Sequence, residues 1–308
     1  MLEVPGWLRN VLEHAGHFSE AGMAGIMRYP RAFNVLGEAV AQGAVSPEAL
    51  EQFLLDASRS KQPSVAIGEQ EWLSNPQTFW STAWHEILRG TDPVVRECGV
   101  LVPSFPTLKA KTRAAIAGGL GTWIPIYLPK DLTEADYPAD FIKPQWGQHL
   151  TVSDIQRRPL PGRWVLVETA QKPDYVDSQG YGNGDDPLAK ELGLASRFHI
   201  LWDTLHETHH PAIAKLLGLS KKAVRSPTAE EWNLIGNLFL WLNANRNMTL
   251  PDLGSTNSWE WTENTYGVGS RLVAGYRAYG GLADVRCRWR DDAYGRIGFR
   301  VLAVLPEA

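Results

Sequence analysis

The chain has 308 residues, of which 44% are hydrophobic and 21% charged, and its formal net charge is −4. These values are typical of a folded protein with one large domain or two ordinary ones. They argue against nucleic acid as a partner, and the absence of a long apolar run argues against a membrane span. With 28 Gly, 20 Pro and 13 Trp, the composition favours a turn-rich fold over a helical bundle.

The first residues and the cysteines bear on the cellular compartment. The start, MLEVPGWLRNVLEHAGHF, lacks a basic stretch followed by an apolar run, so we expect no signal peptide. Cys98 and Cys287 are too few for a disulfide framework or a cysteine zinc cluster. We therefore expect a cytoplasmic protein, with export by a route without a cleavable signal as the alternative.

Residues 1–90 are predicted to be a helical N-terminal region. In SPEALEQFLLDASRS at 46–60, Ser46 is a candidate N-cap, and apolar residues follow at helical spacing. A second helix is predicted in NPQTFWSTAWHEILRG, ending at Gly90. From 91 to 150, recurrent prolines separate short apolar runs, which indicates strands and loops.

The middle of the chain alternates between strand and helix patterns. GRWVLVETA at 162–170 is the clearest strand, and the glycine-containing stretch 177–187 is interpreted as a surface loop. Helices are predicted at 198–219 and, most strongly, at 226–245. The tail from 251 returns to short strands and ends in a predicted core strand, IGFRVLAVL.

The helix predicted at 226–245 carries two further signals. Thr228 and Glu231 have the T-x-x-E spacing of a capping box. Apolar residues lie on more than one of its sides, so we expect it to be buried.

The segment 206–210 reads HETHH, which contains the H-E-x-x-H pattern of zinc metalloproteases. Two histidines four residues apart share a helical face, and the glutamate can act as general base on zinc-bound water. A zinc hydrolase using His206, Glu207 and His210 is therefore one hypothesis. A third ligand is required, and no histidine follows. Glu230 or Glu231 could serve, although Glu231 is the expected capping partner.

Pro211, directly after His210, argues against this hypothesis. Proline disfavours the α conformation in the residue before it, so His210 should lie at a helix end or a kink. The helix dipole also favours histidines in a last turn. We therefore interpret the histidines as helix-terminal residues and predict no metal site and no cofactor. His206 and His210 are the metal candidates if this interpretation is wrong.

Three motifs of the last third follow one another: RSPTAEEW at 225–232, NSWEWTENTYG at 257–267 and RCRWRDDAYGRIGFRVL at 286–302. In this order they resemble the C-type-lectin-like fold of the formylglycine-generating enzyme and sulfatase-modifying factor superfamily. The resemblance is firmest from 225 to 308. It implies an α+β fold with a C-type-lectin-like domain at 91–308, after the helical region at 1–90. Calcium occurs in that superfamily, but the sequence does not place its ligands.

The residue pattern of these motifs agrees with strands. Trp259 and Trp261 alternate with Glu260, which is the period of a half-buried strand. Arg300 lies between Phe299 and Val301, so we expect it to point to the other face and pair with an acid.

Cys287 marks a departure from the oxidising members of that superfamily. Those enzymes carry two nearby cysteines in this segment that bind copper, whereas here Leu282 stands five residues before Cys287. The flanking arginines make an electropositive setting that favours a reactive thiolate, and a small buried residue is the other interpretation. A formylglycine-generating-type oxidase using Cys287 is kept as an alternative.

Among the remaining members, the tail most resembles the variable proteins of diversity-generating retroelements. In that system template adenines are randomised, so asparagine-type codons become many residue types. Tryptophan cannot arise in this way, so Trp259, Trp261 and Trp289 are interpreted as scaffold. The resemblance implies a variable ligand-binding segment at 257–302. The candidate display residues lie in glycine-rich or turn-like surroundings: Tyr266, Val268, Tyr276, Ala278, Tyr279, Leu282, Asp292, Ala293, Tyr294 and Gly295.

We therefore expect a non-enzymatic protein that binds a protein or other macromolecular ligand through this segment. Tyrosine supplies a large rigid contact area at small entropic cost, and small residues adjust the fit. The same tyrosines could instead pack on a sheet. Neither the ligand nor the oligomeric state follows from the sequence.

Overall fold

The computed structural model describes residues 74–89, 100–117, 123–130, 132–170, 186–276, 282, 284–291 and 293–307. All of them lie in one compact unit of the chain, Gly68–Ala308. The helix predicted at 46–60 and most of the loop predicted at 177–187 lie outside the described residues.

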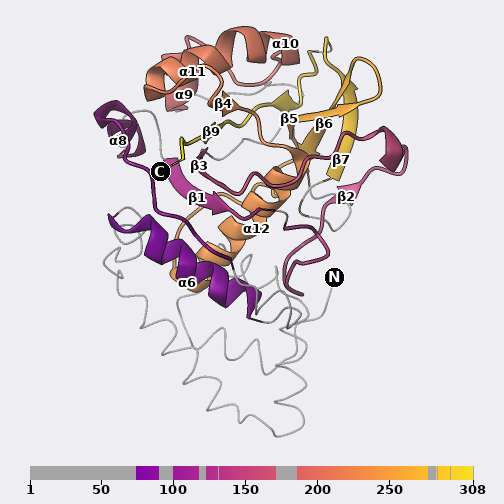
Figure 1. The fold of residues 1–308 in the computed structure, drawn as a ribbon. Helices are drawn as coiled ribbons and strands as arrows, with labels where there is room; N and C mark the ends of the chain where they lie inside the picture. Colours follow the sequence, from indigo (N-terminus) through magenta and orange to yellow (C-terminus); the bar gives the residue numbers. More distant parts are fainter. Residues whose placement is uncertain are drawn as a thin grey trace, which may run out of the picture. The chain divides into compact units, whose positions relative to one another are not determined.

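Helices and strands combine in an α+β fold, as predicted (Figure 1). The described helices are α6 (Pro76–Leu88), α8 (Ala110–Ile116), the 3-10 helix η1 (Val152–Asp154), α9 (Pro187–Glu191), α10 (Trp202–Thr204), the π-helix η2 (Leu205–His209), α11 (His210–Leu217) and α12 (Ala229–Arg246). The described strands are β1 (Trp123–Leu128), β2 (Gln145–Trp146), β3 (Arg163–Glu168), β4 (Val224–Arg225), β5 (Trp259–Tyr266), β6 (Ser270–Gly275), β7 (Asp284–Trp289), β8 (Ile297–Gly298) and β9 (Leu302–Val304).

The described strands form two sheets. One is antiparallel, with the order β1-β3-β9-β4, and β3 confirms the strand predicted at 162–170. The other has the order β2-β7-β6-β5-β8 and is mixed, because β2 and β8 run parallel to their neighbours. Four strands of the second sheet, β5, β6, β7 and β8, come from the predicted variable segment.

Helix α6 confirms the helix predicted at 75–90. Asn75 is its N-cap and accepts a hydrogen bond from the backbone N–H of Thr78 at 3.3 Å. Its two buried indoles donate to β1: Trp80 Nε1 to the carbonyl of Pro125 at 2.7 Å, and Trp84 Nε1 to that of Tyr127 at 3.0 Å. Helix α6, which we assigned to the N-terminal region 1–90, thus packs on strand β1 of the predicted domain 91–308.

Helix α12 confirms the strongest helix prediction, including its capping box. Thr228 Oγ1 accepts from the backbone N–H of Glu231, and the Glu231 carboxylate accepts from the backbone N–H of Thr228. Trp232 and Leu234 are both completely buried although they lie on nearly opposite sides of the helix. The helix is therefore enclosed by the fold, next to β5 and β6 (Figure 1).

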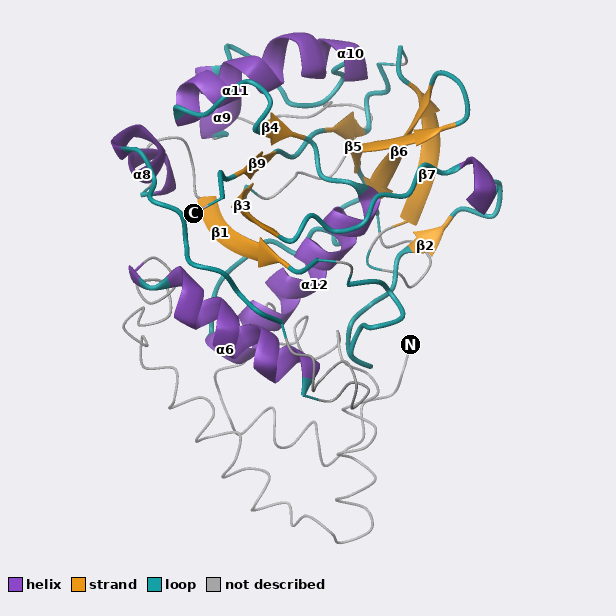
Figure 2. Cartoon of the chain, in the orientation of Figure 1, coloured by secondary structure: helices purple, strands orange, loops and turns teal. Residues whose placement is uncertain are grey.

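Strand β5 sends alternate side chains to two different layers. On one side Glu260 accepts a hydrogen bond from Trp232 Nε1 of α12 at 2.6 Å. On the other side Trp261 Nε1 donates to the carbonyl of Ile200 at 2.9 Å, and Glu263 reaches His206. Figure 2 shows α10 and α11 along the top of these strands, on the side of β5 away from α12. β5 therefore links the core helix to the helical segment that carries the histidines.

Arg300 confirms the predicted pairing with an acid. Its guanidinium is buried and donates to both carboxylate oxygens of Glu260 at 3.1 Å and to the carbonyl of Glu168 at 2.7 Å. Arg197 forms a second buried pair with Glu168, with contacts of 2.7 and 2.8 Å. Burial alone would lower the pKa of Arg197, but Glu168 and Asp186 raise it. These charges are matched inside the protein and tie the two sheets together.

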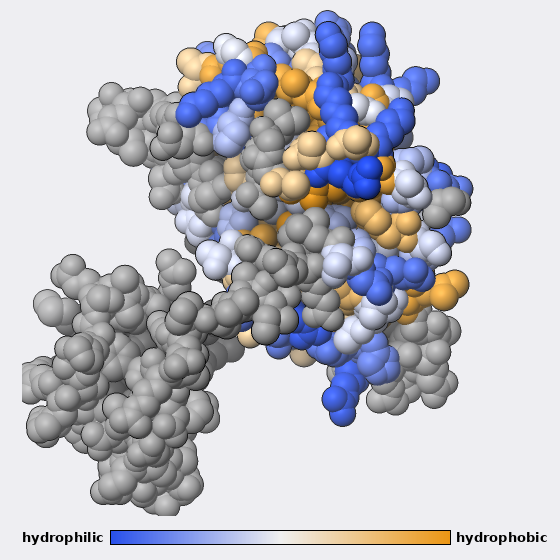
Figure 3. All heavy atoms as spheres, turned by 90° about the vertical axis from the view of Figure 1, so that its left-hand side faces the viewer, coloured by the Kyte–Doolittle hydropathy of each residue, from blue (hydrophilic) through white to orange (hydrophobic). Residues whose placement is uncertain are grey.

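The face over α8 and α11 mixes hydrophilic and hydrophobic side chains (Figure 3). No described helix has the length and apolar character needed to cross a bilayer.

Candidate functional site

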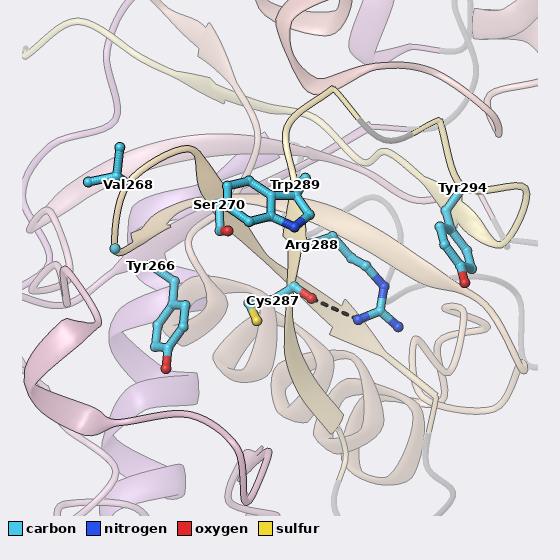
Figure 4. A pocket seen from close by; sticks show the side chains of 8 residues that line it. Tyr266, Val268, Ser270, Cys287, Arg288, Trp289 and Tyr294 are labelled. Carbon is cyan, nitrogen blue, oxygen red and sulfur yellow. Dashed lines mark hydrogen bonds between the residues drawn. The ribbon is translucent and has the colours of Figure 1, made fainter.

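An open pocket of about 630 Å³ lies at one end of the β5–β6–β7 sheet (Figure 4). We call this place the open end of the sheet. All of the lining residues come from the segment predicted to bind ligand: Tyr266, Gly267, Val268, Ser270, Cys287, Arg288, Trp289 and Tyr294. The structure therefore brings three of the ten candidate display residues, Tyr266, Val268 and Tyr294, to one pocket.

The turn between β5 and β6 forms one rim of the pocket. Tyr266 pairs with Ser270, so the turn consists of Gly267, Val268 and Gly269. Both glycines have positive φ angles, +54° and +82°, which residues other than glycine rarely adopt. The turn places Val268 at its tip, where the side chain is 94% exposed.

Trp289, which we interpreted as scaffold, forms the upper wall of the pocket (Figure 4). Its side chain is 61% exposed. Trp289 pairs with Ser270 at the end of β7, and its ring lies over Gly269, where an added Cβ would be 3.1 Å from the ring. Trp259 and Trp261, the other two predicted scaffold residues, are buried.

Arg288 and Tyr294 close the opposite side. The Arg288 guanidinium lies 5.3 Å from the centre of the Tyr294 ring and donates to the carbonyl of Cys287 at 2.8 Å. Tyr294 is 49% exposed. In Figure 4 the Cys287 thiol points toward Tyr266, between the two sides of the pocket. The pocket thus combines aromatic rings with one permanent positive charge.

Leu282 is wrongly included among the display residues. Its side chain is completely buried, and a Cβ added at Gly236 of α12 would lie 2.6 Å from its Cδ2 atom. Leu282 therefore fills a space that a glycine in the core helix leaves open.

The remaining candidate display residues, and the surroundings of Tyr266, differ from one another. Tyr266 is a fixed wall residue, because its hydroxyl donates to the carbonyl of His149 and accepts from the backbone N–H of Thr151. Tyr276 lies at the other end of β6 and packs edge-on against Trp259 at 5.2 Å. Ala293 and Gly295 are half-buried beside Tyr294. Three candidates lie outside the described residues: Ala278, Tyr279 and Asp292.

A second cluster lies behind β5, where His206, His210 and Glu263 come together. One ligand atom from each side chain lies within 4.8 Å of the others. His206 Nε2 is 2.8 Å from Glu263 Oε1, and the two imidazole centres are 4.5 Å apart. These are residue types that bind zinc.

The helix prediction around HETHH needs correction. His210 does not end a helix: the π-helix η2 runs directly into α11, and the His210 N–H bonds to the carbonyl of Leu205. Pro211 has no N–H, and its ring would crowd the carbonyl of Glu207 in a regular α-helix, so the wider π turn accommodates it. His206 and His210 still share one side of the helix.

The carboxylate at this cluster is none of the three that the zinc hypothesis considered, which were Glu207, Glu230 and Glu231. Glu231 binds Arg225 and caps α12, Glu230 pairs with Arg157, and Glu207 is exposed. The carboxylate beside the histidines belongs to Glu263, four residues after Trp259 in the same strand. Only the long-range packing of β5 on the histidine helix brings it there, although the motif NSWEWTE contained it.

Burial and mutual charge determine the protonation of the cluster. Burial lowers the pKa of His210 to about 3, and the charge of His206 acts in the same direction. Burial alone would raise the pKa of Glu263, but the hydrogen bond and charge of His206 lower it. The cluster therefore contains a neutral imidazole and an ionised carboxylate.

Neither a protein-family model, nor a curated protein, nor a solved structure matches this chain.

Proposed function

We propose that this protein is a non-enzymatic binding protein whose open end, around Val268, Trp289 and Tyr294, docks a protein ligand. The observation that carries the proposal is the grouping of exposed apolar residues. Among the described residues, the exposed large hydrophobic side chains are Leu101, Val268, Trp289 and Tyr294. Three of the four surround one pocket, and such clustering marks interaction sites on protein surfaces.

The chemistry of the pocket favours a particular kind of ligand. Tryptophan, tyrosine and arginine are the residue types that contribute most to protein interfaces. The lining residue with a permanent charge is Arg288, and no ion pair within the described residues occupies it. The pocket therefore suits a segment that inserts an apolar or aromatic side chain and places a carboxylate beside Arg288.

We further propose the finer fold and origin that the motifs imply. The body would be a C-type-lectin-like domain, and its segment 257–302 would be diversified by a retroelement. The α+β architecture, the capped buried helix α12 and the buried Arg300 of the GFR motif are consistent with this proposal. Under it, Val268 and Tyr294 vary between copies while Trp289 stays constant as an anchor.

Photo-crosslinking in the source cells tests the binding function. Tyr294 and, in a second sample, Leu101 are each replaced by the photoreactive residue p-benzoylphenylalanine; Leu101 is the matched control, being exposed and apolar but away from the pocket. We expect a discrete protein adduct from position 294 and none from position 101. An excess of unlabelled wild-type protein should compete the adduct away.

Competition with a variant separates specific docking from adhesion. The variant Trp289→Ser removes an exposed wall of the pocket, so it should fold normally and fail to compete. The proposal would be refuted by equal adducts from positions 294 and 101, or by a Trp289→Ser protein that competes as well as the wild type.

A further inference from the structure

We propose that His206, His210 and Glu263 together bind one divalent transition-metal ion of the zinc class, with a fourth coordination position for water. The three side chains come from two elements: the continuous helical segment η2–α11 and strand β5. Two imidazoles and one carboxylate form a common protein ligand set for zinc. This site is separate from the open end and does not depend on the proposed binding function.

The surroundings of His206 give the first reason. Its Nδ1 atom lies 2.8 Å from the carbonyl oxygen of Trp202, and its Nε2 atom lies 2.8 Å from Glu263 Oε1. Both oxygens are acceptors, and a neutral imidazole has one N–H to donate. The second contact therefore needs a positive species, which is either a second proton on the ring or a metal ion that both Nε2 and the carboxylate bind.

His210 distinguishes between these two species. An imidazolium–carboxylate pair is complete with His206 and Glu263 alone. The His210 ring nevertheless stands edge-on to His206, with its Nε2 atom 3.4 Å from Ser226 Oγ, and its burial favours the neutral form, in which one ring nitrogen keeps a lone pair. A metal ion would use this lone pair as a third ligand, whereas a proton shared by His206 and Glu263 has no use for it.

Neighbouring groups hold the three ligands in place. The Nδ1–H of His206 donates to a backbone carbonyl, which fixes the tautomer that leaves Nε2 free for a metal. The Trp202 ring stacks on His206 at 3.5 Å, and the backbone N–H of Ser226 donates to Glu263 Oε1 at 2.9 Å. The ligand positions are thus set by the fold before any ion arrives.

The cluster is also open enough to load. The side chains of His206 and Glu263 are 21% and 11% exposed, while His210 lies behind them at 3%. An ion can therefore enter from the solvent side and keep a water there. Glu207, the glutamate of the H-E-x-x-H pattern, is exposed and is not one of the three clustered side chains, so we assign metal binding to this site and no hydrolytic step.

The test is a Zn²⁺ titration of the chelator-treated full chain against a chromophoric competitor, repeated with Co²⁺ to observe its visible d–d bands. The variant Glu263→Gln removes the carboxylate with little change in shape, and Glu207→Gln makes the same chemical change on an exposed neighbour. We expect one equivalent of Zn²⁺ per chain in the wild type and in Glu207→Gln. Glu263→Gln should bind at least about tenfold more weakly, because loss of a direct ligand weakens binding at least as much as loss of a residue that only supports a ligand.

Thermal unfolding provides a second readout. Zn²⁺ should raise the Tm of the wild type and of Glu207→Gln and leave that of Glu263→Gln unchanged, since only a protein that binds the ion in its native state is stabilised by it. If Glu263→Gln does not fold, His210→Gln takes its place. Absence of stoichiometric Zn²⁺ binding by folded wild-type protein, or equal affinity in the ligand variant and Glu207→Gln, overturns the proposal.

Discussion

The two ends of the β5–β6–β7 sheet treat large apolar side chains in opposite ways. At the open end, Val268 and Trp289 are 94% and 61% exposed. At the other end, which we call the packed end, Tyr276 lies against Trp259 and Leu282 is completely buried. One end of these strands is thus a candidate binding surface, and the other end is part of the core.

The difference comes from what covers each end. At the packed end, α12 places Gly236 under Leu282, and the missing side chain leaves room for the leucine. At the open end, Gly269 admits the Trp289 ring, but no described residue covers the outer face of that ring. Glycine-rich, turn-like sequence occurs at both ends, so sequence context alone does not separate a displayed residue from a packed one.

The largest effect is expected at the packed end. Leu282→Ala should lower the free energy of unfolding by about 2–5 kcal/mol, because it leaves a cavity against α12. Denaturant unfolding measures this change, and Val268→Ala at the open end is the control, expected to stay within about 0.5 kcal/mol. Equal effects of the two substitutions would remove the distinction between the ends.

An intermediate effect is expected at the turn. Gly269→Ala forces a side chain into a backbone with φ of +82° and brings a Cβ to 3.1 Å from the Trp289 ring. We expect a loss of about 1–2 kcal/mol in unfolding free energy and a change in the fluorescence of the displaced indole. Ala293→Gly, a change of one methyl group in the neighbouring loop, should lower the free energy of unfolding by less than about 1 kcal/mol and leave the fluorescence unchanged. Unchanged stability and fluorescence in Gly269→Ala would mean that the turn does not hold Trp289.

The smallest effect on stability is expected when the rim itself is changed. The double variant Val268→Ser, Tyr294→Ser should unfold within about 0.5–1 kcal/mol of the wild type, since both side chains are largely exposed. As an unlabelled competitor, the same variant should fail to reduce the photo-crosslinked adduct. A drop of the size expected for Leu282→Ala would show that the rim is part of the core.

Local patterns predicted those parts of the fold that depend on neighbouring residues. Strand β3, helix α6 and the capping box of α12 all follow from spacing within a few residues. The pairing of Arg300 with an acid followed from strand alternation, although its partners Glu260 and Glu168 are distant in sequence. At the open end, three of the ten candidate display residues line the pocket: Tyr266, Val268 and Tyr294.

The errors share a physical cause, which is long-range packing. Leu282 is buried because a glycine in a different element leaves space for it. Glu263 joins His206 and His210 because β5 packs on the histidine helix. None of these placements is visible in the spacing of residues along the chain. Pro211 predicted a helix end or a kink at His210, but not that a π turn would let the helix continue.

The measurement that tests the central claim most directly is codon-resolved sequencing of this gene across a population of its source cells. The account predicts substitutions concentrated at open-end codons such as Val268, Ala293 and Tyr294, together with a nearby template copy that differs at adenines. Leu282 at the packed end and the anchor Trp289 should stay constant. A segment 257–302 as invariant as the rest of the chain, or one that varies at Leu282 as much as at Val268, would contradict a diversified binding surface.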